Sequence, residues 1–192
     1  MIQTSLISSE RVDLIALTPA FLHASLQRDL TTAEALLGLA LPSEWFAEQR
    51  LIHLRLNDLQ PNAALQPWLL RAIGLRHQQV IIGYIGFHSQ PGAAYLRDLA
   101  PGGIEYGYRV FSAFRRQGVA REACVALMPW AYQEHQVTRF VVSIRPANLP
   151  SRRLAEGLGF KPIDSHVDEE DGLEDIYEVH YRNSKGLQTE RG

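Results

Sequence analysis

Arg115-Arg116-Gln117-Gly118-Val119-Ala120 is the stretch around which the rest of the chain is organised. It follows the strand-like run 104–110 and opens a helix-like run towards His135, so that several main-chain N–H groups at a helix start face a basic turn. Gly118 lets a ligand approach the backbone closely, and the two arginines add charge that a diphosphate would neutralise. The six residues predict a phosphate-binding turn, although an ordinary strand-to-helix turn with two solvated arginines fits them equally well.

The composition is that of an ordinary globular domain, which we place at residues 1–182 of the 192, followed by a polar tail at 183–192. The formal charge of -2 gives no general attraction to nucleic acid or to an anionic membrane. No apolar run approaches the roughly 20 residues that a membrane span needs. The single cysteine, Cys124, cannot form an internal disulfide, and no Cys/His spacing indicates a metal. We therefore expect a soluble, cytoplasmic protein that recognises its ligand locally.

The period of the apolar residues changes along the chain and separates strands from helices. Strands are predicted at 11–17, 68–75, 80–88, 104–110, 139–144, 160–167 and 173–181. Helices are predicted to begin at Pro19 with Thr18 as cap, at Thr31 or Thr32, at Ser43, at Val119, and at Pro150 or Ser151 with Gly157 as the end. The stretches 57–67 and 91–103 are predicted loops, and 168–172 is an acidic turn between the last two strands.

The helix predicted from Val119 contains a proline, which disfavours a continuous helix. Pro129 stands inside the apolar pattern that begins at Val119, and proline in a helix interior costs about 3 kcal/mol. The sequence therefore predicts a kink or an early end near Met128.

Four short blocks give the chain a resemblance to a known family. They are Arg-Val-Asp-Leu at 11–14, Glu-Tyr-Gly-Tyr at 105–108, Arg-x-x-Gly-x-Ala at 115–120, and Asn-x-x-Ser at 148–151 closing in Leu-Gly-Phe at 158–160. In this order they resemble the GCN5-related N-acetyltransferase (GNAT) superfamily, especially its ribosomal-protein acetyltransferase-like (RimJ/RimL-type) branch. The resemblance implies an α/β fold: a mixed, mostly antiparallel sheet flanked by helices, whose splayed middle strands hold acetyl-coenzyme A.

The resemblance also implies which residues bind that cosubstrate. Strand backbone around Tyr108 and Val110 would hydrogen-bond the pantetheine amides, and Asn148 would bond the pantetheine arm or order the loop beneath it. An Asx-type turn before a helix is the alternative role for Asn148. The diphosphate-binding residues would be Arg115, Arg116, Gln117, Gly118, Val119 and Ala120.

Two residues are candidates for the chemistry. Glu105 is the candidate base, against the alternative of a strand glutamate paired to Arg109 or to solvent. Ser151 is the candidate acid or thiol-orienting hydroxyl, against the alternative of a helix N-cap. Many relatives carry a tyrosine acid four residues later, where this chain has Ala155.

Three further residues have weaker claims. His88 ends a predicted strand near the cleft and is an alternative base, although a structural role is the more common one for a single histidine. Trp45 and Phe46 lie in the helical insertion that forms one acceptor wall in relatives, and the alternative for both is a place in the core.

We predict an acetyl-coenzyme A-dependent N-acetyltransferase that acts by direct transfer in a ternary complex, without a metal. The acceptor would be a primary amine, either a small molecule or a protein N-terminus, and a homodimer is compatible with the family. The alternative is a non-catalytic acyl-coenzyme A-binding or sensing domain.

Overall fold

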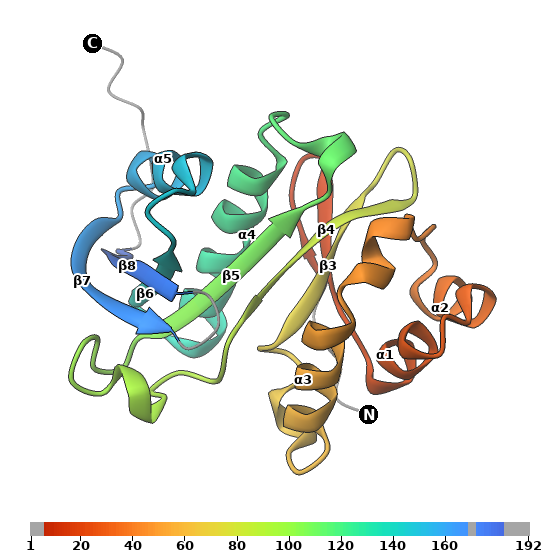
Figure 1. Ribbon diagram of the computed structural model, residues 1–192, viewed down its shortest axis with the longest axis horizontal. Helices are drawn as coiled ribbons and strands as arrows, with labels where there is room; N and C mark the ends of the chain where they lie inside the picture. Colours follow the sequence, from red (N-terminus) through yellow and green to blue (C-terminus); the bar gives the residue numbers. More distant parts are fainter. Residues whose placement is uncertain (1–5, 169–171, 183–192) are drawn as a thin grey trace.

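A single mixed sheet of eight strands forms the centre of the part of the chain that the structure, a computed structural model, describes: residues 6–168 and 172–182 (Figure 1). Its strand order is β1-β2-β3-β4-β5-β6-β8-β7. Every neighbouring pair is antiparallel except β5 and β6, which are parallel, so the predicted mixed and mostly antiparallel sheet is confirmed. The strands are β1 (Ile7–Ser8), β2 (Val12–Ala16), β3 (Leu70–Leu75), β4 (Val80–Phe87), β5 (Ile104–Val110), β6 (Arg139–Ile144), β7 (Lys161–Asp168) and β8 (Gly172–His180).

Helices cover both faces of the sheet. The long helix α4 lies behind β5 in Figure 1, and its buried stripe joins a core formed with one face of the sheet. The helices α1, α2 and α3 pack against the other face, around a second core that contains the fully buried Trp45. The α-helices are α1 (Pro19–Leu26), α2 (Leu30–Leu37), α3 (Gln49–Leu59), α4 (Val119–His135) and α5 (Leu149–Gly157).

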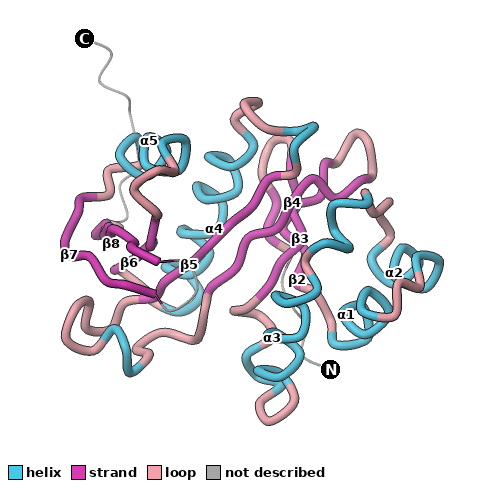
Figure 2. The backbone as a smooth tube through the Cα atoms, in the orientation of Figure 1, coloured by secondary structure: helices cyan, strands magenta, loops and turns pink. Residues whose placement is uncertain are grey.

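The two middle strands separate soon after they meet. The strands β5 and β6 pair at only two positions, Ile104 with Phe140 and Glu105 with Val141. By contrast, β4 and β5 stay paired over five positions, up to Val110. Figure 2 shows β5 running on beside β4 while β6 stays with β8. The sheet therefore opens on the β6 side of β5, as the predicted splay requires.

The predicted strands and the major helix fall close to their expected positions, and the apolar residues of β2 and α4 are buried in the expected period. The strand β7 is the exception, since its Ile163 and Val167 are exposed. Thr18 caps α1, as predicted: its hydroxyl accepts the N–H of Phe21 at 3.2 Å. The middle of the predicted acidic turn and the predicted tail lie outside the described residues.

The N-terminal helices differ from expectation in detail. Asp29 rather than a threonine caps α2, because its carboxylate accepts the Thr32 N–H at 3.1 Å. The helix predicted from Ser43 is two pieces, a 3-10 turn at Ser43–Ala47 and then α3. The predicted loop at 57–67 begins too early, since α3 runs to Leu59, and it contains a 3-10 turn at Ala63–Leu65.

The predicted kink or early end near Met128 is wrong. The helix α4 runs through Pro129 to His135. Leu127 and Met128 before the proline, and Trp130 after it, are buried in the core that α4 forms with the sheet. Tertiary packing on both sides therefore outweighs the local cost of the proline.

The helix α5 begins at Leu149, one residue before the earlier of its two expected starts, Pro150 and Ser151. Asn148 is the cap, and its side-chain oxygen accepts the N–H of Ser151 at 3.3 Å, so the N-cap alternative for Ser151 is wrong. Gly157 is the last helical residue, as predicted, and Gly159 beyond it has a φ of 86°.

A buried hydrogen bond anchors the helical insertion and gives a stability prediction. The Trp45 indole N–H donates to the Ser25 hydroxyl at 2.9 Å, and both residues are fully buried. Ser25→Ala leaves a buried donor without its acceptor, so the free energy of unfolding should fall by about 1–3 kcal/mol in urea denaturation. The exposed Ser8→Ala is the matched control and should change it by less than about 0.5 kcal/mol. A Trp45→Phe background in which Ser25→Ala costs as much as in the natural chain would contradict the assignment.

Candidate functional site

A cavity of about 170 Å³ lies where β5 and β6 separate, closed on one side by α5. It continues into a larger, open depression of about 1290 Å³ that reaches the start of α4. Tyr108, Arg145, Asn148, Ser151 and Leu154 line both spaces. The two spaces therefore form one elongated site from the gap in the sheet to the helix start.

The turn before α4 presents a row of unused hydrogen-bond donors. Among the residues that the structure describes, none accepts a hydrogen bond from the main-chain N–H groups of 116–120. Arg116 has a φ of 59° and Gly118 a φ of 79°, and no side chain caps the helix. Successive free N–H groups at a helix start form a site for an anion.

The two arginines of this turn behave differently. The Arg115 guanidinium turns back and donates through Nε to the carbonyl of Val110 at 2.9 Å, which leaves that oxygen one further lone pair. Arg116 is exposed. Arg115 is exposed as well, so it fixes the turn to the end of β5 while both arginines line the open depression.

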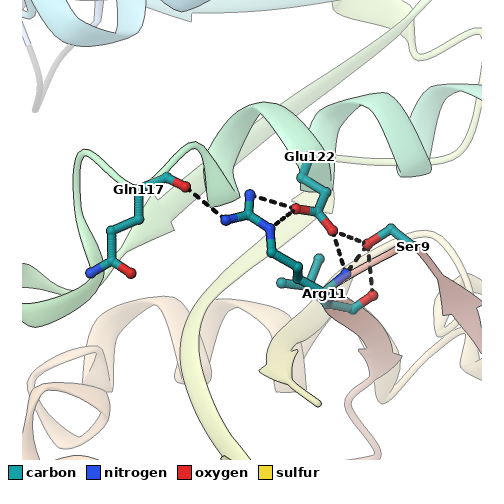
Figure 3. A network of polar contacts seen from close by, with 5 residues as sticks. Ser9, Arg11, Gln117 and Glu122 are labelled. Atoms are coloured by element: carbon teal, nitrogen blue, oxygen red, sulfur yellow. Dashed lines mark hydrogen bonds and ion pairs between the residues drawn. The ribbon is translucent and has the colours of Figure 1, made fainter. Parts of the chain in front are cut away.

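A polar network ties the turn to the N-terminal strands (Figure 3). Arg11 donates to the carbonyl of Gln117 at 3.0 Å and pairs with Glu122, in the first turn of α4, at 2.7 Å. The Ser9 hydroxyl also donates to Glu122, at 2.7 Å. Burial raises the pKa of Glu122, but the bonds from Ser9 and Arg11 outweigh it and hold that pKa below its usual range. The carboxylate is therefore charged at neutral pH and keeps the Arg11 side chain against the turn.

Glu105 stands at the last pair between β5 and β6. Its carboxylate accepts the Ser143 hydroxyl at 2.6 Å and lies 3.5 Å from Nδ1 of His88, with a further hydrogen bond from Tyr95. Burial raises the pKa of Glu105, yet the contacts with His88, Ser143 and Tyr95 outweigh burial and leave that pKa below its usual value. The carboxylate is thus ionised at neutral pH. The predicted alternative partner, Arg109, pairs instead with Glu48 at 2.8 Å.

Ser151 and Tyr108 face each other across the cavity. The Ser151 hydroxyl hydrogen-bonds the phenol of Tyr108. Burial raises the pKa of Tyr108 to about 12, and the bond from Ser151 offsets part of that rise, so the phenol stays protonated at neutral pH. Ala155 and Cys124 also line the cavity. Burial raises the pKa of the Cys124 thiol to about 12, so it stays a neutral thiol.

The structure brings most of the predicted site residues together. Tyr108, Val110, Asn148 and Ser151 line the joined spaces with most of the turn, and Glu105 lies at the closed end of the gap. Trp45 does not line the site, because it is fully buried in the core beneath α1, and Phe46 packs on that core half-buried.

Sequence reasoning missed three residues of the site. Ser143 is a hydroxyl in an otherwise apolar strand run, and that exception was a usable signal. Arg11 opens one of the four blocks, but its contact with the turn depends on the fold, as does the contact of Tyr95 with Glu105, and neither contact has a local signal.

Metal binding and membrane insertion were also considered for the described residues. Within 6–168 and 172–182, no group of three or more histidine, cysteine or acidic side chains is placed to hold a metal ion. In the same part of the chain, no helix combines the length and the apolar character needed to cross a membrane.

Solved structures share this fold at low sequence identity. RimJ of Mycobacterium smegmatis, in complex with coenzyme A disulfide, matches with a TM-score of 0.63 and 17% identity, over 93% of this chain and 88% of that one. An acetyltransferase of Salmonella typhimurium that modifies the N-terminal serine of ribosomal protein L7/L12 matches with 0.61 and 16%, over 93% and 100%. The ribosomal-protein-S5-alanine acetyltransferase of Vibrio fischeri matches with 0.62 and 13%, over 95% and 100%.

The family of the chain follows from its sequence. No curated protein sequence matches the chain. Residues 18–161, most of the 192, match the family described as the acetyltransferase (GNAT) domain. That match includes the turn before α4, the splayed strands and the start of α5. The chain therefore belongs to the GNAT family of acetyl-coenzyme A-dependent acetyltransferases.

Proposed function

We propose that the protein transfers the acetyl group of acetyl-coenzyme A to a primary amine, by direct attack of the amine in a ternary complex. One observation carries the proposal: a single continuous site joins a turn of free N–H groups to a gap in the sheet that ends at an ionised carboxylate. A diphosphate suits the first end and a reacting amine the second.

The cosubstrate would bind along β5. The N–H groups of Gln117, Gly118, Val119 and Ala120 would take the diphosphate, assisted by Arg116. The main chain of Tyr108 and Val110 lies beyond the last pair between β5 and β6, so it is available to the pantetheine amides, as an added strand would be. Asn148 lines both spaces, although its side-chain oxygen already caps α5.

The chemistry needs placement and two proton transfers. The amine must lose a proton before it attacks the thioester carbon, and Glu105 provides the base function, directly or through a neighbouring group. The C–S bond then breaks, and the thiolate gains a proton. Ser151 is the proposed acid, and it is hydrogen-bonded to the protonated phenol of Tyr108. Ser151 would thus take the role of the tyrosine that many relatives carry at the position of Ala155.

The acceptor would be a small molecule or a protein N-terminus. The Salmonella neighbour is described as modifying the N-terminal serine of a ribosomal protein, and the Vibrio fischeri neighbour as a ribosomal-protein-S5-alanine acetyltransferase, which favours a protein acceptor. A panel of peptides that begin with serine or alanine, together with small primary amines, tests this through release of free thiol from acetyl-coenzyme A. Saturable binding of coenzyme A without thiol release from any amine would favour the acyl-coenzyme A-binding alternative.

The phosphate turn can be tested with a matched pair of glycines. Gly118→Val should raise the Kd of coenzyme A at least about tenfold in calorimetry, because a β-branched residue cannot hold a φ of 79° and the N–H groups would turn away. Gly38→Val is the control, since Gly38 has a φ of 74°, caps a helix far from the site in sequence, and has open space around it. If the two variants bind coenzyme A with equal affinity, the turn is not part of the coenzyme A site.

The network of Figure 3 gives a second binding test. Arg11→Ala removes the charged hydrogen bond to the carbonyl of Gln117, so we expect the Kd of coenzyme A to rise by about tenfold. Arg76→Ala is the control: Arg76 bonds the carbonyl of Ser9 and lies 3.6 Å from Asp13 in the same N-terminal strands, without contact to the turn. If both variants weaken binding alike, the effect belongs to the strands and not to the turn.

A pH profile tests Glu105. The low pKa keeps its carboxylate charged throughout the neutral range, whereas the fraction of protonated amine rises as pH falls. Glu105→Gln should therefore lower kcat/KM most at low pH, and the loss should shrink as pH rises and the amine becomes neutral by itself. Steady-state rates from pH about 6 to 9 measure this. A loss that is constant across the range would discard Glu105 as part of the base.

A further inference from the structure

We infer that His88 is the catalytic base of the transfer and that Glu105 is the positioning carboxylate behind it. The inference rests on the proposed amine acetylation and assigns the route by which the amine loses its proton.

The backbone holds His88 at the gap. It follows directly after β4, its N–H donates to the carbonyl of Glu105 at 2.9 Å, and its own carbonyl accepts Nη1 of Arg55 at 3.2 Å. Both contacts use main-chain atoms of His88, so they survive replacement of its side chain. The main chain of His88 is thus held from two neighbouring elements, β5 and α3.

The imidazole lies along β5 with its two nitrogens at different places. Nδ1 is 3.5 Å from the Glu105 carboxylate. Nε2 lies over Gly107, where an added Cβ would come within 3.0 Å of it. Gly107 lines the cavity between β5 and β6, two residues beyond the last pair at Glu105. Nε2 therefore lies beside a residue that lines the gap, and Gly107 has no side chain to stand between the two.

Exposure decides which of the two groups meets an incoming amine. The His88 side chain is 41% exposed and that of Glu105 is 9% exposed. The Glu105 carboxylate is already occupied by Ser143 and Tyr95 on its other sides. An amine arriving from solvent reaches Nε2 of His88 first, while Glu105 is placed to orient the ring and to stabilise its charged form.

The charges around the ring favour this division of roles. Glu105 of β5 is ionised, and Tyr95 of the loop before β5 contributes a hydroxyl to the same carboxylate. On α3, the charge of Arg55 is offset by Asp58 at 2.9 Å. Of these groups, the charge that contacts the ring is the Glu105 carboxylate, 3.5 Å from Nδ1.

Each proton and each electron pair of the transfer has a destination. Nε2 takes a proton from the ammonium group, and the neutral amine attacks the thioester carbon to form the C–N bond. The intermediate collapses, the C–S bond breaks, and its electron pair leaves on sulfur. The second proton on nitrogen passes to the Ser151 hydroxyl as that hydroxyl gives its own proton to the thiolate. The products are an amide, a free thiol, an unchanged Ser151 and an imidazolium that returns its proton to water.

The test uses the full chain and the peptide or small amine of the panel from which the natural protein releases most thiol. His88→Ala should lower kcat by about 10²–10³-fold, with the Kd of coenzyme A unchanged. Added imidazole should restore part of that activity, a rescue that a structural role for His88 does not give. Glu105→Gln should lower kcat less than His88→Ala does, and added imidazole should not restore it. The double variant, which carries both changes, should be no slower than His88→Ala alone. His180→Ala, from another His–Glu pair, is the control and should keep full activity.

Two outcomes overturn the inference separately from the function. A His88→Ala variant within about threefold of the natural rate assigns the base to Glu105 itself. A loss in His88→Ala that imidazole does not rescue makes His88 a structural residue. If the natural protein releases no thiol with any amine of the panel, the proposed function falls, and this inference falls with it.

Discussion

The site depends on one constraint: β5 and β6 hold together at only two residue pairs. Beyond Glu105 the edge of β5 has no partner strand, and backbone polar groups in such a place need another partner. The same separation makes room for the cavity, brings α5 over it, and sets Tyr108 against Ser151. A sheet paired along its whole length would have had no place for an acyl group.

The separation is stabilised by the carboxylate at its closed end. Glu105 contacts Ser143 on β6 and His88 after β4, so three neighbouring strands meet at one ionised group. Such a group is costly to bury unless donors surround it, and here they do. Glu48, another buried carboxylate, stands at the start of α3, accepts the Tyr84 hydroxyl at 2.8 Å and pairs with Arg109 of β5 at 2.8 Å. Both carboxylates therefore contact β5 or a neighbour of it, but only Glu105 lies on that strand, at the point where the sheet opens.

What the sequence predicts well is local. The strand 104–110, the turn before α4 and the start of that helix follow from residue period and from Gly118. What it could not predict depends on contacts distant in the chain: the continuation of α4 through Pro129 rests on core packing, and the partners of Glu105 come from three different segments. The motif residues were found because their spacing is short, and Arg11 was missed because Gln117 lies 106 residues away.

The hydrogen bond from Arg11 to Gln117 also couples the turn to local unfolding of the N-terminal strands. The strand β1 is an edge of the sheet, and edges open first in local unfolding. Because Ser9 and Arg11 both bond to Glu122 in the first turn of α4, fraying of that edge releases the diphosphate turn as well. By reciprocity, an anion bound at the turn would slow amide hydrogen exchange in β1 and β2. The N-terminal strands would then contribute to the binding free energy of a ligand whose proposed site they do not line.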